Sequence, residues 1–540
     1  MRYIYILLLV WALSAQSQTT GYYFVAFKDK AYNTYSLNVP SAFLSQRALD
    51  RRTRQQIIID SLDLPVSDNY INQLTALGFN IHSKSKWLNG VIVILNNSTD
   101  FNTIQTLQFV KSIKYLRPLN PVKSKIEKFE VATKQYNYGY AANQIEMMNG
   151  QYLHNLGKKG EGMLIAVLDA GFIGVDTIRY FDSLHVQNRI VLTRDIVDGY
   201  NDSYVYESHP HGTMVLSTMV VLRNNEFVGT SPKASYALIR TEEGAHEYIL
   251  EEYAWVIGAE LADSIGADVI NSSLGYTTFD DSTMNHTWAD LTGRVAVSSI
   301  AATICARKGM IVCVSAGNSG DDIWRKIGSP ADADSVLTVG AVDANRNYAY
   351  FSSQGYSADG RVKPDVSAQG LSSAIIREDG TLTFGSGTSF SSPILCGLVT
   401  CLWQANPQKN NMEIIEAVRK SASQYNTPDS LLGYGIPNFE LANHILAGID
   451  ANFQNNWLVK SVYPNPCEQG VTINYSSPVY TQVQISMFSV DGKLVYQLFP
   501  WFELTNEGSL YIPMSAFDKG YYWFEIYSNE AKVVIPVVKK

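Results

Sequence analysis

Strands and helices alternate along the middle of the chain, between residues 144 and 446. The predicted strands there are continuously apolar, as at residues 164–168, 269–270 and 311–314. Strands without a polar face are buried on both sides, as in a parallel sheet covered by helices. Between them, apolar residues recur every four positions and predict an amphipathic helix: Ile249, Tyr253, Ile257, Leu261 and Ile265. Residues 144–446 are therefore predicted to form an α/β domain around a doubly wound parallel sheet.

A smaller domain is predicted upstream, over residues 20–119. Its patterns predict a mixed set of elements: strands at residues 22–27, 79–83, 90–95 and 110–115, and helices at residues 41–52, 67–77 and 99–107. This order indicates a small α+β domain. Residues 120–143 carry four lysines and few large aliphatic side chains. They are predicted to form an exposed linker that is open to proteolysis.

Helical patterns stop after residue 446. Short strands are predicted instead, at residues 471–475, 482–488, 493–498, 509–512, 521–527 and 532–538. Asp491-Gly492 is a hairpin turn signal between two of them. We therefore expect a linker over residues 447–460 and a separate β-sandwich over residues 461–540.

The N-terminus has the pattern of a secretory signal peptide. Arg2 precedes a short apolar stretch, and small residues follow it up to Ser17, which predicts removal of residues 1–17. The alternative, a membrane anchor, needs an apolar segment of about 20 residues. Residues 295–314 are the nearest other candidate, but Arg307 and Lys308 interrupt them. We expect no transmembrane segment in the mature protein.

Composition indicates a globular protein and argues against nucleic acid as a partner. Of the 540 residues, 46% are hydrophobic and 17% are charged, so disorder along the whole chain is excluded. Acidic residues outnumber basic ones by 50 to 42, for a net charge of −8. Binding to a phosphate backbone requires the opposite balance.

Five cysteines are few for an exported chain, and their odd number leaves at least one outside any internal pair. Cys396 and Cys401 are predicted to share one helix, where their spacing is too long for a disulfide. We predict that they stay unpaired. Cys305 and Cys313 form either a disulfide or two buried thiols.

Two polar residues are predicted to lie at the same edge of the parallel sheet. Asp169 ends an apolar strand, and ligand sites in such sheets lie at the carboxyl ends of the strands. By itself it could equally cap a helix or close a turn. His211 begins a predicted helix, whose positive end disfavours imidazolium, so a catalytic base there needs a nearby carboxylate. Alternatively, His209 and His211 are a surface pair or two metal ligands.

Ser389 and Asn318 add groups suited to acyl transfer. Ser389 lies at the predicted start of a helix, whose outward N–H groups can hold an anion. Pro393 has no N–H, so the carbonyl of Ser389 lacks its usual helical partner. Asn318 follows another apolar strand, and its amide could donate to the same oxyanion. Taken alone, the segment around Ser389 is an ordinary glycine–serine loop capped by Thr388. Taken alone, Asn318 is a turn asparagine.

Together, four motifs resemble those of the subtilisin-like serine proteases (peptidase S8 family). They occur in the order that marks this fold: Val167-Leu168-Asp169-Ala170-Gly171, His211-Gly212-Thr213, Ala316-Gly317-Asn318 and Gly387-Thr388-Ser389-x-Ser391-x-Pro393. The resemblance implies that Ser389 is the nucleophile, His211 the general base and then acid, and Asp169 the residue that orients His211. It implies an oxyanion hole formed by Asn318 and the Ser389 N–H.

The resemblance also implies peptide-bond hydrolysis through an acyl-enzyme, with substrate lying along two segments. The predicted substrate-binding residues are Ser272, Ser273, Leu274, Gly275, Ser315, Ala316 and Gly317. Three positions depart from the common family pattern, namely Ala170, Met214 and Phe390, and they affect expected substrate preference and pH optimum. No cofactor is expected. Structural calcium is common in the family, but no ligand set is assignable, so no metal residue is predicted.

The flanking domains extend the resemblance. The position of residues 20–119 implies a propeptide that assists folding, covers the active site and is cleaved off in the linker; the alternative is a permanent accessory domain. Three motifs of the last domain resemble a type IX secretion sorting domain: Tyr463-Pro464-Asn465-Pro466, Lys519-Gly520-Tyr521-Tyr522 and Lys539-Lys540. The alternative is a carbohydrate- or protein-binding sandwich.

The chain is accordingly predicted to be a secreted, self-processing serine endopeptidase of a Gram-negative bacterium. The sorting resemblance implies export through the periplasm, the outer-membrane secretion machinery as a partner, and a final location outside the cell or on its surface. Protein or peptide substrates are the other expected partners. The alternative from another class is an inactive surface or adhesive protein built on a protease scaffold.

Overall fold

A computed structural model describes residues 20–119, 139–199, 202–447, 458–476, 481–504, 507–527 and 532–540. The chain divides into two compact units, one up to Asn443 and one from His444 onward. The predicted signal peptide and most of both predicted linkers lie outside the described residues. No helix among the described residues is long and apolar enough to cross a membrane.

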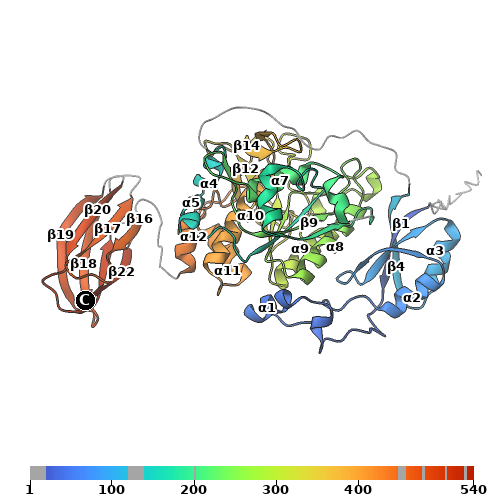
Figure 1. Cartoon of the computed structure of the whole chain (residues 1–540), viewed down its shortest axis with the longest axis horizontal. Helices are drawn as coiled ribbons and strands as arrows, with labels where there is room; N and C mark the ends of the chain where they lie inside the picture. The colour runs from blue at the N-terminus through green and yellow to red at the C-terminus, as the bar shows by residue number, and fades with distance from the viewer. Residues whose placement is uncertain are drawn as a thin grey trace, which may run out of the picture. The chain divides into compact units, whose positions relative to one another are not determined.

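The first unit begins with the small α+β domain that the sequence predicts (Figure 1). Its antiparallel sheet has the order β2-β3-β1-β4, with β1 at Gly21–Phe27, β2 at Asn80–Ser85, β3 at Gly90–Leu95 and β4 at Val110–Pro118. Helices α2 (Asp68–Ala76) and α3 (Ser98–Gln105) pack on this sheet. Val25, Val91 and Val93 are fully buried in its core.

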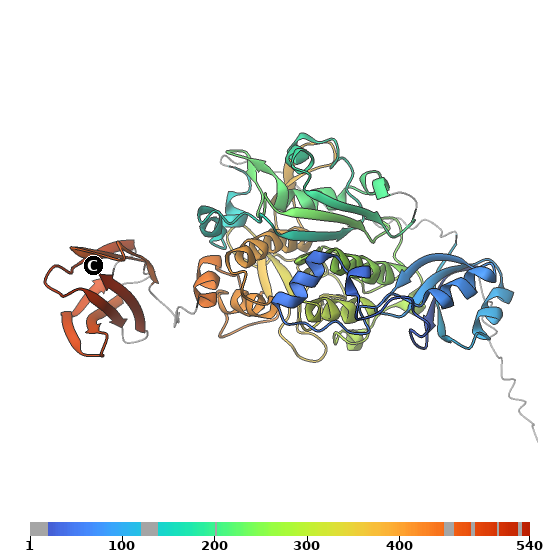
Figure 2. The ribbon, with the colours of Figure 1, turned by 60° about the horizontal axis from the view of Figure 1, so that its bottom comes forward.

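The predicted helix over residues 41–52 is wrong in its bounds. The structure has a 3-10 turn at Pro40–Ala42 and then helix α1 at Gln46–Arg54. The side chain of Ser45 accepts the N–H of Ala48, which is the N-cap arrangement that starts a helix at the next residue. Helix α1 lies against the helices of the α/β domain rather than on its own sheet (Figure 2).

The α/β domain is built on a seven-stranded parallel sheet of order β13-β12-β11-β10-β5-β9-β6, which confirms the predicted fold class. The strands are β5 (Leu164–Asp169), β6 (Ile190–Asp195), β9 (Ser235–Arg240), β10 (Val269–Ser272), β11 (Ile311–Ser315), β12 (Leu337–Val342) and β13 (Val366–Gln369). Helices α7 (His211–Val220) and α10 (Thr388–Ala405) pack on one face. Helices α8 (Leu250–Ile265) and α9 (Val297–Arg307) pack on the other.

Smaller elements complete this unit, and one of them, α12, extends past its end at Asn443. They are α4 (Ala142–Glu146), α5 (Gly150–Asn155), α6 (Asp182–Val186), α11 (Asn411–Lys420), α12 (Phe439–Leu446) and the strands β7 (Leu222–Arg223), β8 (Phe227–Val228), β14 (Ser373–Ile376) and β15 (Leu382–Gly385). All five cysteines of the chain are buried free thiols, so the prediction for Cys396 and Cys401 is confirmed. Of the two alternatives for Cys305 and Cys313, a disulfide or two buried thiols, the structure has two buried thiols.

The second unit contains two antiparallel sheets, as predicted for its β-sandwich. One has the order β16-β17-β20 and the other β19-β18-β21-β22. The strands are β16 (Leu458–Tyr463), β17 (Gly470–Ser476), β18 (Thr481–Ser489), β19 (Leu494–Leu504), β20 (Glu507–Pro513), β21 (Gly520–Tyr527) and β22 (Lys532–Lys539). Ile473 of one sheet and Phe524 of the other belong to one buried cluster. Strand β16, which the sequence analysis left out, begins inside the predicted linker and pairs with β17.

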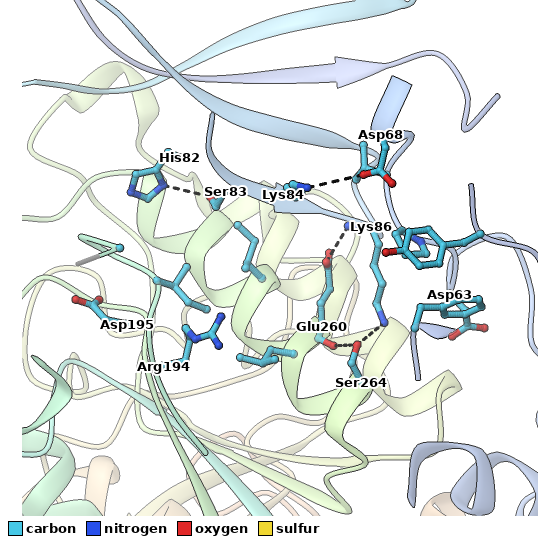
Figure 3. Close-up of a pocket in the computed structure, with 18 of the residues that line it drawn as sticks. Asp63, Asp68, His82, Ser83, Lys84, Lys86, Arg194, Asp195, Glu260 and Ser264 are labelled. Carbon is cyan, nitrogen blue, oxygen red and sulfur yellow. Dashed lines mark hydrogen bonds and ion pairs between the residues drawn. The ribbon is translucent and has the colours of Figure 1, made fainter. Parts of the chain in front are cut away.

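The N-terminal domain meets the α/β domain along α8. The carboxylate of Glu260 on α8 accepts the N–H groups of Lys86 and Trp87, at 2.8 and 3.0 Å, and the hydroxyl of Ser85. A cavity of about 880 Å³ lies beside this contact, with residues of both domains in its lining. Figure 3 shows the Lys86 side chain reaching down to Ser264, one helical turn beyond Glu260.

Candidate active site

Asp169 is the last residue of β5, an interior strand of the parallel sheet. Its side chain is fully buried, and its Oδ1 accepts the N–H of Ala170 at 2.8 Å. The guanidinium group of Arg240 donates to the carbonyl of Ala170 at 3.2 Å and pairs with Asp195. Arg240 thereby fixes the backbone that follows the carboxylate.

His211 is the first residue of α7 and is also fully buried. Its Nδ1 lies 2.7 Å from Oδ1 of Asp169, so a proton on Nδ1 is donated to the carboxylate. Gly212 makes this approach possible, because a Cβ there would lie 2.4 Å from the carbonyl oxygen of Gly171. A buried carboxylate in this position selects the tautomer of the imidazole with its proton on Nδ1.

Ser389 is the second residue of α10. Its carbonyl, which Pro393 cannot bond, accepts the hydroxyl of Ser273 at 2.9 Å, and its own hydroxyl donates to the carbonyl of Ser273 at 3.4 Å. The ring centroid of the next residue, Phe390, lies 6.5 Å from that of His211. The structure therefore brings the start of α10 to the start of α7, where the Asp169–His211 pair lies.

Asn318 is held in one orientation by Thr388, the residue before Ser389. Its Oδ1 accepts both the N–H of Thr388, at 2.9 Å, and the Thr388 hydroxyl, at 2.8 Å. Since a backbone N–H can only donate, these contacts identify the accepting atom as oxygen. The Nδ2 group is left on the other side of the amide, and the side chain is exposed to solvent. Asn318 can thus donate to a ligand beside Ser389.

A cleft of about 430 Å³ joins most of the predicted site residues. It is lined by Ser389 and Asn318 and by five of the predicted substrate-binding residues: Ser273, Leu274, Gly275, Ser315 and Gly317. The other two, Ser272 and Ala316, are buried and do not line it. The hydroxyl of Ser272 instead accepts the indole N–H of Trp255 at 2.9 Å.

The lining of the cleft is predominantly acidic among its charged residues, a feature not predicted from the sequence. Glu242, Glu243, Glu247, Asp280 and Asp322 line the cleft, against a single lysine, Lys326. These residues come from three loops that only the folded chain brings together, so no local sequence signal could have identified them. The cleft therefore favours positively charged groups on a bound ligand.

Three carboxylates, those of Glu242 and Glu247 of the cleft lining and that of Glu251, have oxygens within 4.8 Å of one another. Oxygen donors of this kind suit calcium. However, Glu242 accepts the hydroxyl of Tyr276, and Glu251 accepts the N–H of Glu243 at 2.8 Å. Burial and the negative charge of Glu242 raise the pKa of the Tyr276 phenol well above its usual value. These partners account for two of the carboxylates, and we assign no metal site.

Family models match three successive parts of the chain. The model of the subtilase family matches residues 160–435. The model of the peptidase S8 propeptide domain of Bacteroidota matches residues 22–132, and that of a secretion system C-terminal sorting domain matches residues 461–540. The last match marks the chain as a secreted or cell-surface protein.

Individual relatives agree with the central match. Subtilisin DY of Bacillus licheniformis is 30% identical over 303 residues, which cover 55% of this chain and 97% of the relative. Subtilisin E of Bacillus subtilis is 29% identical over 336 residues, which cover 62% of this chain and 78% of the relative. The crystal structure of the epidermin leader peptide processing serine protease from Staphylococcus aureus superimposes with a TM-score of 0.54 at 17% identity, covering 79% of this chain and 98% of that one, which supports the fold.

No comparison supports the alternative of an inactive scaffold. The family models, the relatives and the sheet with its cleft agree with one another. The chain belongs to the subtilase family and is a serine endopeptidase, preceded by a peptidase S8 propeptide domain and followed by a secretion sorting domain.

Proposed function

We propose that Asp169, His211 and Ser389 form the catalytic triad of this protease and that Asn318 completes its oxyanion hole. The single observation that supports this most strongly is the buried contact between His211 Nδ1 and Asp169 Oδ1, 2.7 Å long. It points the opposite ring nitrogen, Nε2, away from the carboxylate, on a helix that packs against α10. Ser389 stands at the first turn of α10 and on the wall of the cleft.

The first chemical step is attack by the Ser389 hydroxyl on the scissile carbonyl. The hydroxyl turns from Ser273 toward His211 when substrate binds, and Nε2 removes its proton as the C–O bond forms. The imidazolium ion is stabilised by Asp169, which stays ionised. His211 then gives the proton to the leaving amine, and the acyl-enzyme is hydrolysed by water through the same steps.

Negative charge builds up on the substrate carbonyl oxygen in both halves of the reaction. The N–H of Ser389 and the Nδ2 group of Asn318 are the donors that we assign to this oxygen. Thr388 supports the assignment, since its two contacts to Oδ1 of Asn318 direct the NH₂ end outward. A donor that is already oriented costs no reorganisation during the reaction.

Replacement of Asn318 by alanine is expected to lower kcat by about 10²- to 10³-fold, the range known for the oxyanion asparagine of subtilisin, a relative of this chain. KM should change little, because the contact forms in the transition state. Steady-state hydrolysis of a peptide substrate gives both constants. A matched control is Asn345→Ala, which alters an exposed asparagine outside the cleft. A large rise in KM with unchanged kcat would instead assign Asn318 to substrate binding.

The precursor is proposed to cut itself in the segment after β4. Arg117, at the end of β4, pairs with Glu243, one of the acidic residues that line the cleft. Burial alone would lower the pKa of Arg117, but the contacts with Tyr22 and Glu243 raise it above its usual value. The chain that leaves β4 therefore starts at the rim of the cleft, which supports cleavage of the following segment by the same molecule.

The sorting domain is proposed to carry the enzyme out of the periplasm and across the outer membrane. A chain that lacks residues 451–540 should keep its peptidase activity but accumulate in the periplasm. Fractionation of cells that express either form, followed by activity assays, measures this. Normal export of the shortened enzyme, with weaker attachment to the cell, would show instead that the sandwich is a binding module.

A further inference from the structure

Arg51 of the propeptide domain is completely buried against the catalytic domain. Because arginine is rarely buried without partners, its contacts there are informative. It lies on α1, the helix that leaves its own sheet and packs against α8. Its side chain is 1% exposed, and its partner Asp263 is fully buried. The contact is separate from the active-site cleft, since none of these residues lines that cleft.

The guanidinium group meets oxygen atoms at the ends of two helices. Its Nε donates to the carbonyl of Lys308, which ends α9, at 3.1 Å. One terminal nitrogen donates to the carbonyl of Ala267, just after α8. The other donates to the carbonyl of Asp263, at 3.2 Å, and to its carboxylate. All of these acceptors belong to the catalytic domain.

The acceptors share one electrostatic reason for binding a cation. The last carbonyl groups of a helix carry the negative end of its dipole and accept donors from outside the helix. The carbonyl of Asp263 also accepts the N–H of Gly266, at 3.1 Å. Helices α8 and α9, of 16 and 11 residues, end side by side at this point. The carboxylate of Asp263 adds a full negative charge. Burial alone would raise its pKa, but the positive charges of Lys86, Arg51 and Arg52 lower it to about 2.

A planar fork fits this arrangement better than a single ammonium group. The three nitrogens of the guanidinium group make four contacts, with oxygen atoms in the last turn of α8 or just beyond the ends of α8 and α9. Arginine offers five N–H donors in fixed directions, whereas lysine offers one compact charge. Arg51 shares the carboxylate of Asp263 with Arg52 and Lys86. Arg52 also pairs with Asp63, as does Lys308.

We propose that the C-terminal ends of α8 and α9 form a binding site for a guanidinium group, whose ligand in the full-length chain is Arg51. The site selects arginine over lysine and holds the propeptide by a contact outside the cleft. If the linker is cut as proposed above and the propeptide domain then dissociates, the same site becomes open on the catalytic domain to another guanidinium group. The binding claim itself does not depend on that cleavage.

The test is chemical rescue in the full chain. Ser389→Ala is present throughout, so that the propeptide stays attached whether or not the proposed processing occurs. Arg51→Ala removes the atoms that ethylguanidine contains, and it should lower Tm by roughly 5 °C. Ethylguanidine should then raise Tm in a saturable way and recover at least half of the loss. Ethylammonium, which has the same charge without the fork, should not.

Two variants act as controls. Arg54→Ala removes an arginine of the same helix whose side chain is 39% exposed, so ethylguanidine should give it no saturable gain. Arg51→Lys keeps the charge but lacks the fork, so its Tm should be lowered nearly as much as that of Arg51→Ala. If Arg51→Ala does not fold, the yield of refolded protein with ethylguanidine, compared with ethylammonium, is the measurement. Equal effects of the two cations, no saturation, or full stability of Arg51→Lys would overturn the proposal.

Discussion

Replacement of Ser389 by alanine is expected to lower kcat by about 10⁶-fold, the loss known for the nucleophile of subtilisin itself. The reason is that every step of the proposed path passes through a bond to this oxygen, while the rest of the site stays in place. Ser389 also packs with Ser273, but the hydroxyl contact between them is 3.4 Å long and contributes little to stability. The folded chain should therefore survive the change.

The same variant should stay at full length. Intact-mass measurement of purified wild-type and variant chains compares their N-termini after incubation. Ser386→Ala is the matched control, because that hydroxyl lies in the same loop but accepts the N–H of Ser372 and does not line the cleft. It should process and turn over normally. Processing of the Ser389→Ala chain at the wild-type rate, in the absence of another protease, would contradict self-cleavage.

Replacement of Asp169 by asparagine is expected to lower kcat by about 10⁴-fold, as in other serine proteases with this triad, subtilisin among them. The amide is nearly the same size, so the packing around β5 should persist. It cannot stabilise an imidazolium ion, however, and its NH₂ group favours the tautomer of His211 with the proton on Nε2. That tautomer cannot accept the Ser389 proton.

Asp198→Asn is the matched control, because it makes the same chemical change at a half-buried carboxylate outside the proposed triad. Asp198 shares the guanidinium group of Arg240 with Asp195, so one ion pair remains after the change. Its kcat should stay within a few-fold of the wild-type value. Steady-state kinetics and thermal unfolding of both variants separate a catalytic loss from a folding defect. If Asp169→Asn kept most of its activity, the role of Asp169 would be structural only.

The positions of the proposed triad residues were predictable because these residues lie at the ends of regular elements. Asp169 follows an apolar strand, and His211 and Ser389 begin helices, so their positions follow from hydrophobic patterns and from turn residues. The prediction from Pro393 is also specific: the carbonyl of Ser389 needed a partner outside its helix, and Ser273 provides one.

Other features depend on contacts between distant segments and carry no local signal. The true start of α1 depends on capping by Ser45, while the apolar pattern continues across it. The burial of Arg51 could not be inferred, since a helix rich in arginine is usually a solvent-exposed one. The acidic lining of the cleft likewise arises from loops that are adjacent only in the folded chain.

The central claim is that the Ser389 oxygen is made nucleophilic by His211 and Asp169. Labelling with a fluorophosphonate tests this most directly, since the reagent modifies an activated hydroxyl and leaves ordinary serines unmodified. After digestion of the labelled full-length protein, mass spectrometry should find the adduct on Ser389, and labelling should be lost in a His211→Ala variant. An unmodified Ser389 in folded, proteolytically active protein, or labelling that does not need His211, would contradict the account.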